Sequence, residues 1–249
     1  MNNFTAHVSA NRPSSQLRGE PGSTTTVARF EAFLPPTGER DEGGPIDCVA
    51  YGAVADALLT PPFPGGWVVV SGNLKIPKAA KNEQALPPEL TASKVWPAVP
   101  LGDPSEVTDA LNIITLVGRA GLDPEVRYFE SGGCVANLRM AVNRRSRDDE
   151  PDWFNLAIWG KQAQVAADYV RKGSLLAVVG SLKFDSWTDR ASGEERRRPV
   201  VLVSRLDLLG SKRDQENAGG EAPRTWGGKT PAFRQGPPAQ APTAGGGMW

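Results

Sequence analysis

The 249-residue sequence has few of the residues that catalytic and metal sites use. It contains one histidine, His7, and two cysteines, Cys48 and Cys134. Acid–base catalysis most often uses histidine, and zinc sites need closely spaced Cys and His ligands, so both classes are disfavoured. No phosphate-cradling glycine loop and no nucleophile–base arrangement is present in the sequence. We therefore expect no enzyme, no metal and no cofactor, and His7 is expected to be a surface residue without a role.

Long apolar runs are also missing. No stretch approaches the roughly 18 apolar residues that a membrane-spanning helix needs. The first residues, MNNFTAHVSANRP, lack the basic start and the apolar run of a signal peptide. The two cysteines fall in expected strands without paired spacing, which favours small buried side chains in a reducing compartment. The sequence thus predicts a soluble, cytoplasmic (nucleoid-associated) protein with no membrane partner.

An excess of either charge is absent as well. The 28 basic and 28 acidic residues give a formal net charge of +0. Proteins that bind polyanions are often strongly basic, so the overall charge does not favour nucleic acid, although local stripes of charge matter more than sums. Only 39% of the residues are hydrophobic, while there are 27 glycines and 22 prolines. Part of the chain is therefore expected to pack no core.

What the sequence does contain is an internal repeat. Three segments match three later ones at a single offset of 108 residues, without a gap: TTVARFEAFL (25–34) with GCVANLRMAV (133–142), IDCVAYG (46–52) with FNLAIWG (154–160), and WVVVSGNLKI (67–76) with LLAVVGSLKF (175–184). A single register over so long a span predicts a tandem duplication with one divergent copy.

Each copy is expected to fold as strands with one helix. In the second copy the strands are expected at 113–121, 135–144, 153–161, 174–187 and 198–209, with a polar loop at 188–198. The helix is expected after 161, with Val165, Ala166, Tyr169 and Val170 on its apolar face and Gly173 at its end. Five strands, one helix and glycines inside strands, such as Gly118 and Gly180, indicate an OB-fold, a five-stranded Greek-key barrel.

The predicted fold class is therefore all-β with one short helix per domain, as two tandem OB-folds. The expected domains are a divergent OB-like domain at 1–100 and an OB-fold at 108–212. A disordered Gly/Pro-rich tail is expected at 213–249, because this segment has no periodicity and cannot bury enough surface to offset its entropy.

One expected strand, DWFNLAIWGK (152–161), carries two indoles. Alternation places Phe154, Leu156 and Ile158 on a core face. It places Trp153, Asn155, Ala157 and Trp159 on the other face, with Lys161 in line. That second face is either part of another core or a surface on which flat ligands stack.

A family resemblance favours the stacking surface. The segments LNIITLVGRAGLDPEVRYFESGGCVANLRMAVNR, DEPDWFNLAIWGKQAQVAADYVRKGSLLAVVGSLKFDSWTD and VVLVSRLDLLGSKRD resemble the bacterial single-stranded DNA-binding protein family over roughly 111–213. The resemblance implies an OB-fold, an oligomer with four OB-folds, a flexible tail, and coating of single-stranded DNA in replication, recombination and repair. It implies base stacking on Trp153, Trp159 and Trp187, and phosphate contacts from Lys161, Arg127, Arg144, Arg145 and Arg147.

Two positions depart from the family pattern. A tryptophan often found before the third strand is replaced by Ser146, so one stacking position is expected to be missing or moved. Family members end in an acidic tip with a terminal aromatic that docks partner enzymes. Here Met248 and Trp249 keep the aromatic end, but no acidic residue follows Glu221. Recruitment of replication and repair proteins by the usual route is therefore in question.

The first copy has lost most of the implied DNA contacts. At the same offset Trp153, Trp159, Lys161 and Trp187 are replaced by Pro45, Tyr51, Ala53 and Ala79. We expect a structural role for this copy, in a homodimer that supplies four OB-folds, with a homotetramer or an independent module as alternatives. Two other functions stay open at this point. One is an OB-fold protein-interaction module with weak nucleic-acid binding, and the other is a single-stranded RNA binder.

Overall fold

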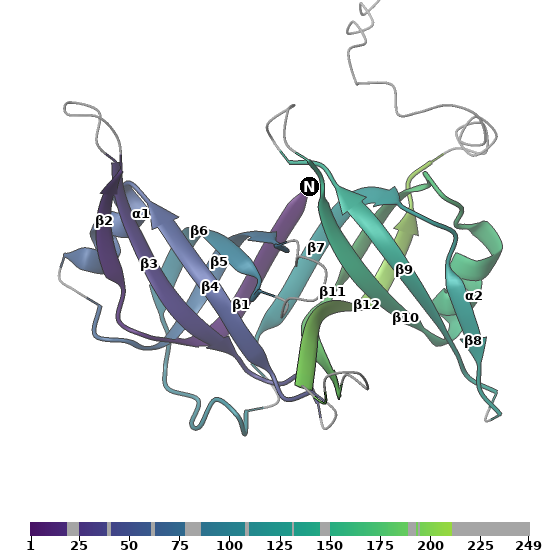
Figure 1. The fold of residues 1–249 in the computed structure, drawn as a ribbon, viewed down its shortest axis with the longest axis horizontal. Coiled ribbons are helices and arrows are strands. Elements are labelled where there is room, and N and C mark those ends of the chain that lie inside the picture. Colours follow the sequence, from purple (N-terminus) through teal and green to yellow (C-terminus); the bar gives the residue numbers. More distant parts are fainter. Residues whose placement is uncertain are drawn as a thin grey trace, which may run out of the picture. The chain divides into compact units, whose positions relative to one another are not determined.

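Twelve strands and two short helices make up the described part of the chain (Figure 1). The computed structural model describes residues 1–18, 25–38, 41–60, 63–77, 86–107, 110–130, 132–144, 150–188, 193 and 195–210. The predicted tail at 213–249 lies outside the described residues. None of the described helices is long and apolar enough to cross a membrane.

The first half of the chain forms a closed five-stranded barrel. Strand β1 pairs with β5 along one edge and, at Ser9 and Ala10, with β3 along the other, which closes the order β1-β5-β6-β4-β3 into a ring. Strand β2 extends the sheet by pairing with β3. The elements are β1 (Asn2–Ala10), β2 (Ser14–Arg18), β3 (Thr25–Leu34), β4 (Gly44–Tyr51), α1 (Ala53–Leu59), β5 (Gly66–Lys75) and β6 (Glu89–Pro97).

The second half repeats this barrel. The order β7-β11-β12-β10-β9 closes where Arg119 and Ala120 of β7 pair with β9. A short strand that the sequence did not predict, β8, pairs with β9. The elements are β7 (Asn112–Ala120), β8 (Glu125–Tyr128), β9 (Cys134–Val142), β10 (Asp152–Trp159), α2 (Gly160–Tyr169), β11 (Leu175–Thr188) and β12 (Glu195–Leu208). Two five-stranded barrels with one helix each confirm the predicted OB-folds.

The pairing registers show that the repeat is longer than the sequence indicated. Phe4 pairs with Gly72 in the first barrel as Ile114 pairs with Gly180 in the second, so β1 maps onto β7 at an offset of 110. The last strands map at 111, since Cys48 pairs with Leu90 as Leu156 pairs with Val201. The middle strands keep 108. The ladder register also shifts at the same place in both barrels, between Ser71 and Gly72 and between Val179 and Gly180.

Helix α2 differs from its predicted form. It begins at Gly160, whose φ of 60° turns the chain out of β10, and ends at Tyr169 rather than at Gly173. The buried side chains are Ala163 and Ala166, whereas Val165 and Tyr169 are 40% and 57% exposed. The predicted apolar face is therefore wrong at Val165 and Tyr169, because the helix packs on the barrel through its small residues.

The two barrels are joined by their first strands. Residues Asn2–Ala6 of β1 pair antiparallel with Asn112–Leu116 of β7. His7 continues this junction: its backbone N–H donates to the Leu111 carbonyl (2.7 Å), and its Nδ1 accepts from the Leu111 N–H (3.0 Å). The expectation that His7 has no role is therefore wrong, since the side chain satisfies a backbone donor between the barrels.

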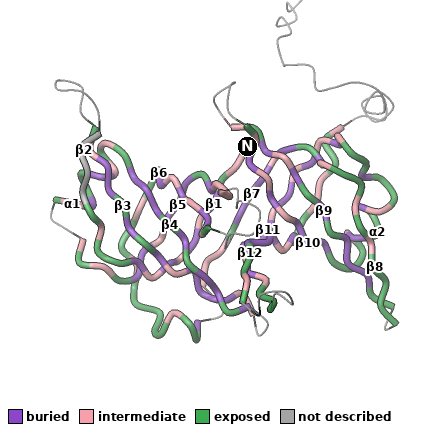
Figure 2. Tube along the Cα trace, viewed as in Figure 1, coloured by how far each residue is buried: buried purple, intermediate pink, exposed green. Residues whose placement is uncertain are grey.

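Each barrel is filled by alternate residues of its strands (Figure 2). In β1 the buried positions are Phe4, Ala6, Val8 and Ala10, and the residues between them face outward. Both cysteines are buried and unbridged, as expected. Burial raises the pKa of the Cys48 thiol, so it packs as a small neutral side chain.

Candidate nucleic-acid interface

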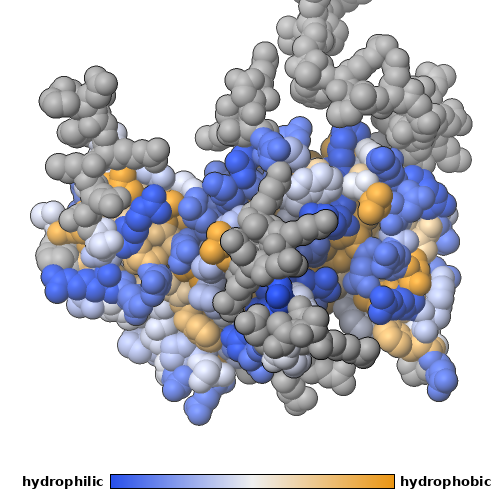
Figure 3. All heavy atoms as spheres, in the orientation of Figure 1, coloured by the Kyte–Doolittle hydropathy of each residue, from blue (hydrophilic) through white to orange (hydrophobic). Residues whose placement is uncertain are grey.

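Strand β10 has the two faces that alternation predicts, except that Ala157, expected on the outer face, is buried. Phe154, Leu156 and Ile158 are buried in the second barrel. On the opposite face Trp153 is half-buried and Trp159 is 50% exposed. The two indoles are therefore held by the backbone of one strand, whose inner side chains anchor it in the core. Figure 3 shows hydrophobic spheres flanked by hydrophilic ones on the β9 and β10 side of this barrel.

Trp159 lies in an aromatic group that extends beyond β10. Its ring stacks on that of Phe129, with 5.8 Å between centroids and 9° between planes. Phe129 and its neighbour Tyr128 are 43% and 68% exposed. Trp159 pairs with Val135 of β9, which pairs in turn with Arg127 of β8. Directly paired residues share a face, so the predicted cation Arg127 lies in the row of Trp159.

Trp153 is fixed from two sides. The guanidinium carbon of Arg139 lies 5.1 Å from the centroid of the ring. On the turn after β7, a Cβ added to Gly121 would lie 2.5 Å from Trp153 Cζ3, so the indole rests against the glycine backbone. Arg139 was not among the predicted site residues. Arg139 pairs with Asn155 and is therefore the diagonal neighbour of Trp153 across the β9–β10 ladder. Alternation along β9 would have placed it on the same face as the indole.

Trp187 lies near the end of β11, at the base of the hairpin loop that joins β11 to β12. Strands β11 and β12 pair as far as Thr188 and Glu195, so residues 195–198 of the predicted polar loop are strand. Trp187 is 43% exposed, and the guanidinium carbon of Arg198 lies 5.6 Å from its ring centroid. Arg198 also lies 3.6 Å from a carboxylate oxygen of Asp185. The long strands present an indole and cations together.

The predicted phosphate-binding cations have different environments. Arg127 is exposed on β8. Lys161 is exposed but lies in α2 and not in line with β10, because Gly160 ends the strand. Arg144 forms a bidentate ion pair with Asp152: its Nε lies 3.1 Å from Oδ2 and a terminal nitrogen lies 2.8 Å from Oδ1. Since Asp152 is only 6% exposed, this pair holds the start of β10. Arg145 and Arg147 lie outside the described residues, as do Ser146, Met248 and Trp249.

The matching face of the first barrel is acidic. Glu31, Asp47 and Glu89 lie side by side across β3, β4 and β6. They occupy the positions of Arg139, Asn155 and Val200 in the second barrel. Burial raises the pKa of Asp47, and the charges of Glu31 and Glu89 raise it further, against an opposing effect of Arg29. Lys75 lies 3.9 Å from a carboxylate oxygen of Glu89 and offsets part of this charge, so the row has an excess of carboxylates that disfavours phosphates.

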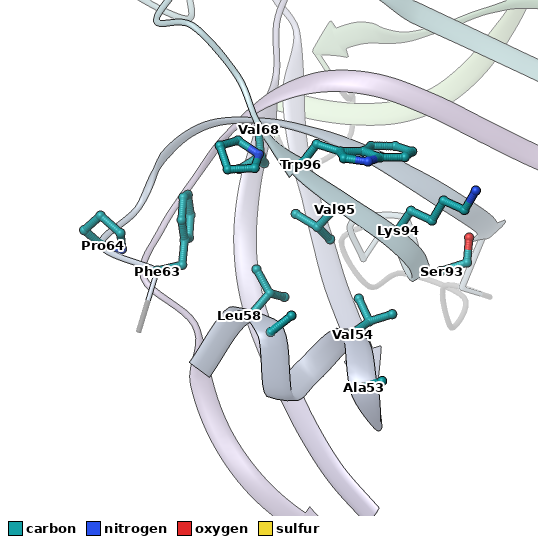
Figure 4. A pocket seen from close by; sticks show the side chains of 12 residues that line it. Ala53, Val54, Leu58, Phe63, Pro64, Val68, Ser93, Lys94, Val95 and Trp96 are labelled. Carbon is teal, nitrogen blue, oxygen red and sulfur yellow. The ribbon is translucent and has the colours of Figure 1, made fainter. Parts of the chain in front are cut away.

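A hollow of about 500 Å³ also lies in the first barrel, between α1 and the end of β6 (Figure 4). Val54, Leu58, Phe63 and Val95 line it, with Trp96 and Lys94 at its rim. All its lining residues belong to the first barrel, so it is separate from the indoles of the second. Within the described residues, no three His, Cys, Asp or Glu side chains are placed to hold a metal ion.

Comparison with known proteins identifies the second barrel. The model of the single-strand binding protein family matches residues 111–209. A "Single-stranded DNA-binding protein" from Thermosynechococcus vestitus is 65% identical over 106 residues, which are 43% of this chain and 88% of that protein. The chain belongs to the single-strand binding protein family. "Single-stranded DNA-binding protein 1" of a Nostoc species is 59% identical over 107 residues, 43% of this chain and 90% of its own length.

A solved structure extends the likeness to both barrels of this family member. The wild-type single-stranded DNA binding protein from Thermus aquaticus matches with a TM-score of 0.55 and 22% sequence identity. The match covers 90% of this chain and 96% of that one. At this identity the likeness concerns the fold, and it agrees with a two-barrel chain. Membership of the single-strand binding protein family also supports the expectation that the chain is not an enzyme.

Proposed function

We propose that the chain binds single-stranded DNA without sequence preference and protects it during replication, recombination and repair. The observation that carries the proposal is the set of three accessible indoles on the second barrel, Trp153, Trp159 and Trp187, each beside a cation or another ring. Base–aromatic stacking contributes about 1–3 kcal/mol per base and tolerates any sequence, because every base has a π-face. The family membership of residues 111–209 supports the same function.

Cations around the indoles are proposed to contact phosphates. Arg127 shares a row with Trp159, Lys161 follows it in α2, and Arg139 and Arg198 lie over the other two rings. Arg145 and Arg147 stay in the proposal from the sequence alone. Arg144 is assigned instead to orienting β10 through Asp152. Phosphate contacts add affinity that falls as salt rises, whereas stacking does not.

The first barrel is proposed to be structural. Its row of three carboxylates and the loss of the indole positions disfavour DNA on the matching face. The proposed boundaries are 1–100 for this domain, 108–212 for the DNA-binding domain and 213–249 for a tail, whose end, Met248 and Trp249, is proposed to dock replication or repair proteins.

A homodimer with four barrels is the proposed assembly. The sheet β6-β5-β1-β7-β11-β12 is continuous across the junction of the barrels. Its outward residues on β7 and β11 include Ile113, which is 46% exposed, and the half-buried Val117 and Val179. Such an apolar patch on one sheet face fits a second copy of the same face.

The test of DNA binding is tryptophan fluorescence titrated with oligo-dT, oligo-U and duplex DNA at two salt concentrations. Quenching by oligo-dT is expected, and each Trp→Ala change at 153, 159 or 187 is expected to weaken binding about tenfold or more. Trp96→Phe is the matched control, because Trp96 is equally exposed and also has a cation, Lys94, 5.8 Å from its ring centroid. Unchanged affinity in the triple variant would exclude the stacking surface, and tighter binding of oligo-U would favour RNA.

A further inference from the structure

We infer that the first barrel positions the Trp187 hairpin for DNA, so that the divergent copy acts on binding without touching the nucleic acid. This inference rests on the proposed function. The hairpin consists of the outer parts of β11 and β12, residues 183–188 and 195–200, beyond the points where β7 stops pairing with β11 at Gly180 and β10 stops pairing with β12 at Val201. It leaves the second barrel there and needs other support.

Side chains supply the acceptors that β7 no longer provides. Along the edge of β11, the Leu182 N–H donates to Oδ1 of Asn112 (2.9 Å), and the Asn112 amide donates to the Leu182 carbonyl (2.7 Å). The next N–H on that edge, from Phe184, donates to Oδ1 of Asp41 at 3.1 Å. Asp41 belongs to the first barrel, in the connection between β3 and β4. The edge of the DNA-binding hairpin is therefore completed by the other domain.

Asp41 is built to hold a fixed position. The residue is 9% exposed and accepts four hydrogen bonds. Thr37 donates from its backbone N–H and its hydroxyl to Oδ2, both at 2.8 Å, and Gly43 N–H donates to Oδ1 at 3.1 Å. The fourth donor is Phe184. A carboxylate with this many donors fixes the loop that carries it, and hence the hairpin bound to that loop.

Packing and charge reinforce the same contact. A Cβ added to Gly44 would lie 2.7 Å from the Phe184 ring, so the ring sits directly on the glycine backbone. Phe184 is 5% exposed. A terminal nitrogen of Arg197 also lies 2.9 Å from a carboxylate oxygen of Glu42. This ion pair is exposed and adds little by itself, so Asp41 and Phe184 carry most of the anchoring.

One face of the hairpin therefore contacts the first barrel, and the other carries Trp187. Phe184 and Ser186 alternate with Asp185 and Trp187 along β11, and Arg197 pairs with Ser186. The face with Phe184 and Arg197 rests on the first barrel. Alternation turns Trp187 to the opposite face, where its diagonal neighbour Arg198, the partner of Asp185, lies over the ring. The first barrel thus supports the hairpin from behind while the indole stays accessible.

The residues that make this contact between the Phe184 ring and Gly44 are not repeated when the two barrels are exchanged. At the offset of 108, Gly44 corresponds to Asp152, whose side chain occupies the space and binds Arg144. Phe184 corresponds to Ile76. The glycine that admits an aromatic ring is therefore present only in the copy that lost its indoles, and the ring only in the copy that kept them.

Asp41→Ala in the full chain tests the inference by two measurements. Without DNA, hydrogen exchange of the 182–188 and 195–199 amides is expected to speed up about tenfold, because the edge loses its fixed acceptor. Oligo-dT affinity is expected to fall by about fivefold, and not to fall further in a Trp187→Ala background, because a positioning residue acts through the indole. Asp41→Asn keeps Oδ1 and is expected to restore part of both effects. Glu31→Ala, an exposed carboxylate on β3, is the matched control.

Three outcomes overturn the inference: unchanged hairpin exchange in Asp41→Ala, faster exchange with unchanged affinity, or an affinity loss that adds fully to that of Trp187→Ala. Should Asp41→Ala fail to fold, Gly44→Ala replaces it, since the added methyl group would displace the Phe184 ring from the glycine backbone and is expected to loosen the same amides. If the wild-type chain does not bind oligo-dT, the proposed function fails, while the exchange result still decides whether the first barrel holds the hairpin.

Discussion

Single residues separate the two barrels more clearly than overall charge does. Glu31, Asp47 and Glu89 form a row in the first barrel, where the second has Arg139, Asn155 and Val200. Burial raises the pKa of Asp47, and the like charges of Glu31 and Glu89 on the neighbouring strands raise it further. The row costs the fold stability at neutral pH.

Asp47→Asn is therefore expected to stabilise the protein at pH 7. The raised pKa means that the folded state holds the proton more tightly than the unfolded state, so stability falls as pH rises through the folded pKa. The gain is expected to be within about 0.5 kcal/mol, because the position is exposed. It should disappear near pH 3, where the carboxyl is protonated in both states. Thermal unfolding of both proteins from pH 3 to pH 8 measures it.

Asp103→Asn provides a control of opposite sign. Ser105 donates from its N–H and hydroxyl to Asp103 Oδ1 at 2.9 and 2.7 Å, and these bonds lower the pKa of Asp103. A lowered pKa contributes stability above the unfolded value, which is lost as pH falls. Asp103→Asn is thus expected to lower, never raise, the melting temperature at pH 7. Equal shifts in both variants would contradict the electrostatic account.

At the residue scale the sequence revealed the indoles but not their surroundings. Alternation in β10 predicted the faces of Trp153 and Trp159 correctly. It did not reveal that Phe129 stacks on Trp159 or that Arg139 covers Trp153, because both contacts depend on the pairing of β9 with its neighbours. Nor did it reveal that Arg144, a predicted phosphate contact, pairs with Asp152 eight residues later. Periodicity in the sequence predicts on which face of a strand a side chain lies, whereas its contacts depend on which strands pair and in which register.

At the element scale the repeat was found only where its length is constant. The offset is 108 in the middle strands, 110 in the first and 111 in the last, so insertions in the connections hid the outer strands from a search in one register. Gly118 and Gly180 lie where neighbouring strands approach closely. A Cβ at either position would lie 2.2 Å from a carbonyl oxygen, that of Leu202 or of Ala141.

Gly180→Ala is expected to destabilise the second barrel. The added methyl group would force β12 away at the register shift beside Val179, where no flexible side chain can give way. The expected loss of unfolding free energy is about 1–3 kcal/mol, typical of overpacking a close-packed interior. Urea unfolding measures it, with the neighbouring Ser181→Ala as control. A midpoint equal to that of the wild-type chain would show that the strands are not so close there.

At the scale of the whole molecule, the first strands of both barrels are already paired within one chain. A further copy is therefore expected to join through the sheet face and not through these edges. Native mass spectrometry is expected to give two chains of 26.6 kDa each. Ile113→Asp is expected to give single chains, because it places a charge on the exposed apolar face without entering the core. A native mass of four chains would contradict the proposed homodimer.

The junction of the barrels has one more consequence. Phe4 pairs with Ile114, and at an offset of 110 these two residues occupy the same position in their barrels. They mark a local twofold axis. In a dimer of identical subunits, the residue on such an axis faces its own copy, and every substitution there is made twice. Here a large ring faces a smaller branched side chain. Because both barrels are in one polypeptide, the two residues at this position can differ, and neither has to pack against a copy of itself. The pairing of the barrels also does not depend on protein concentration.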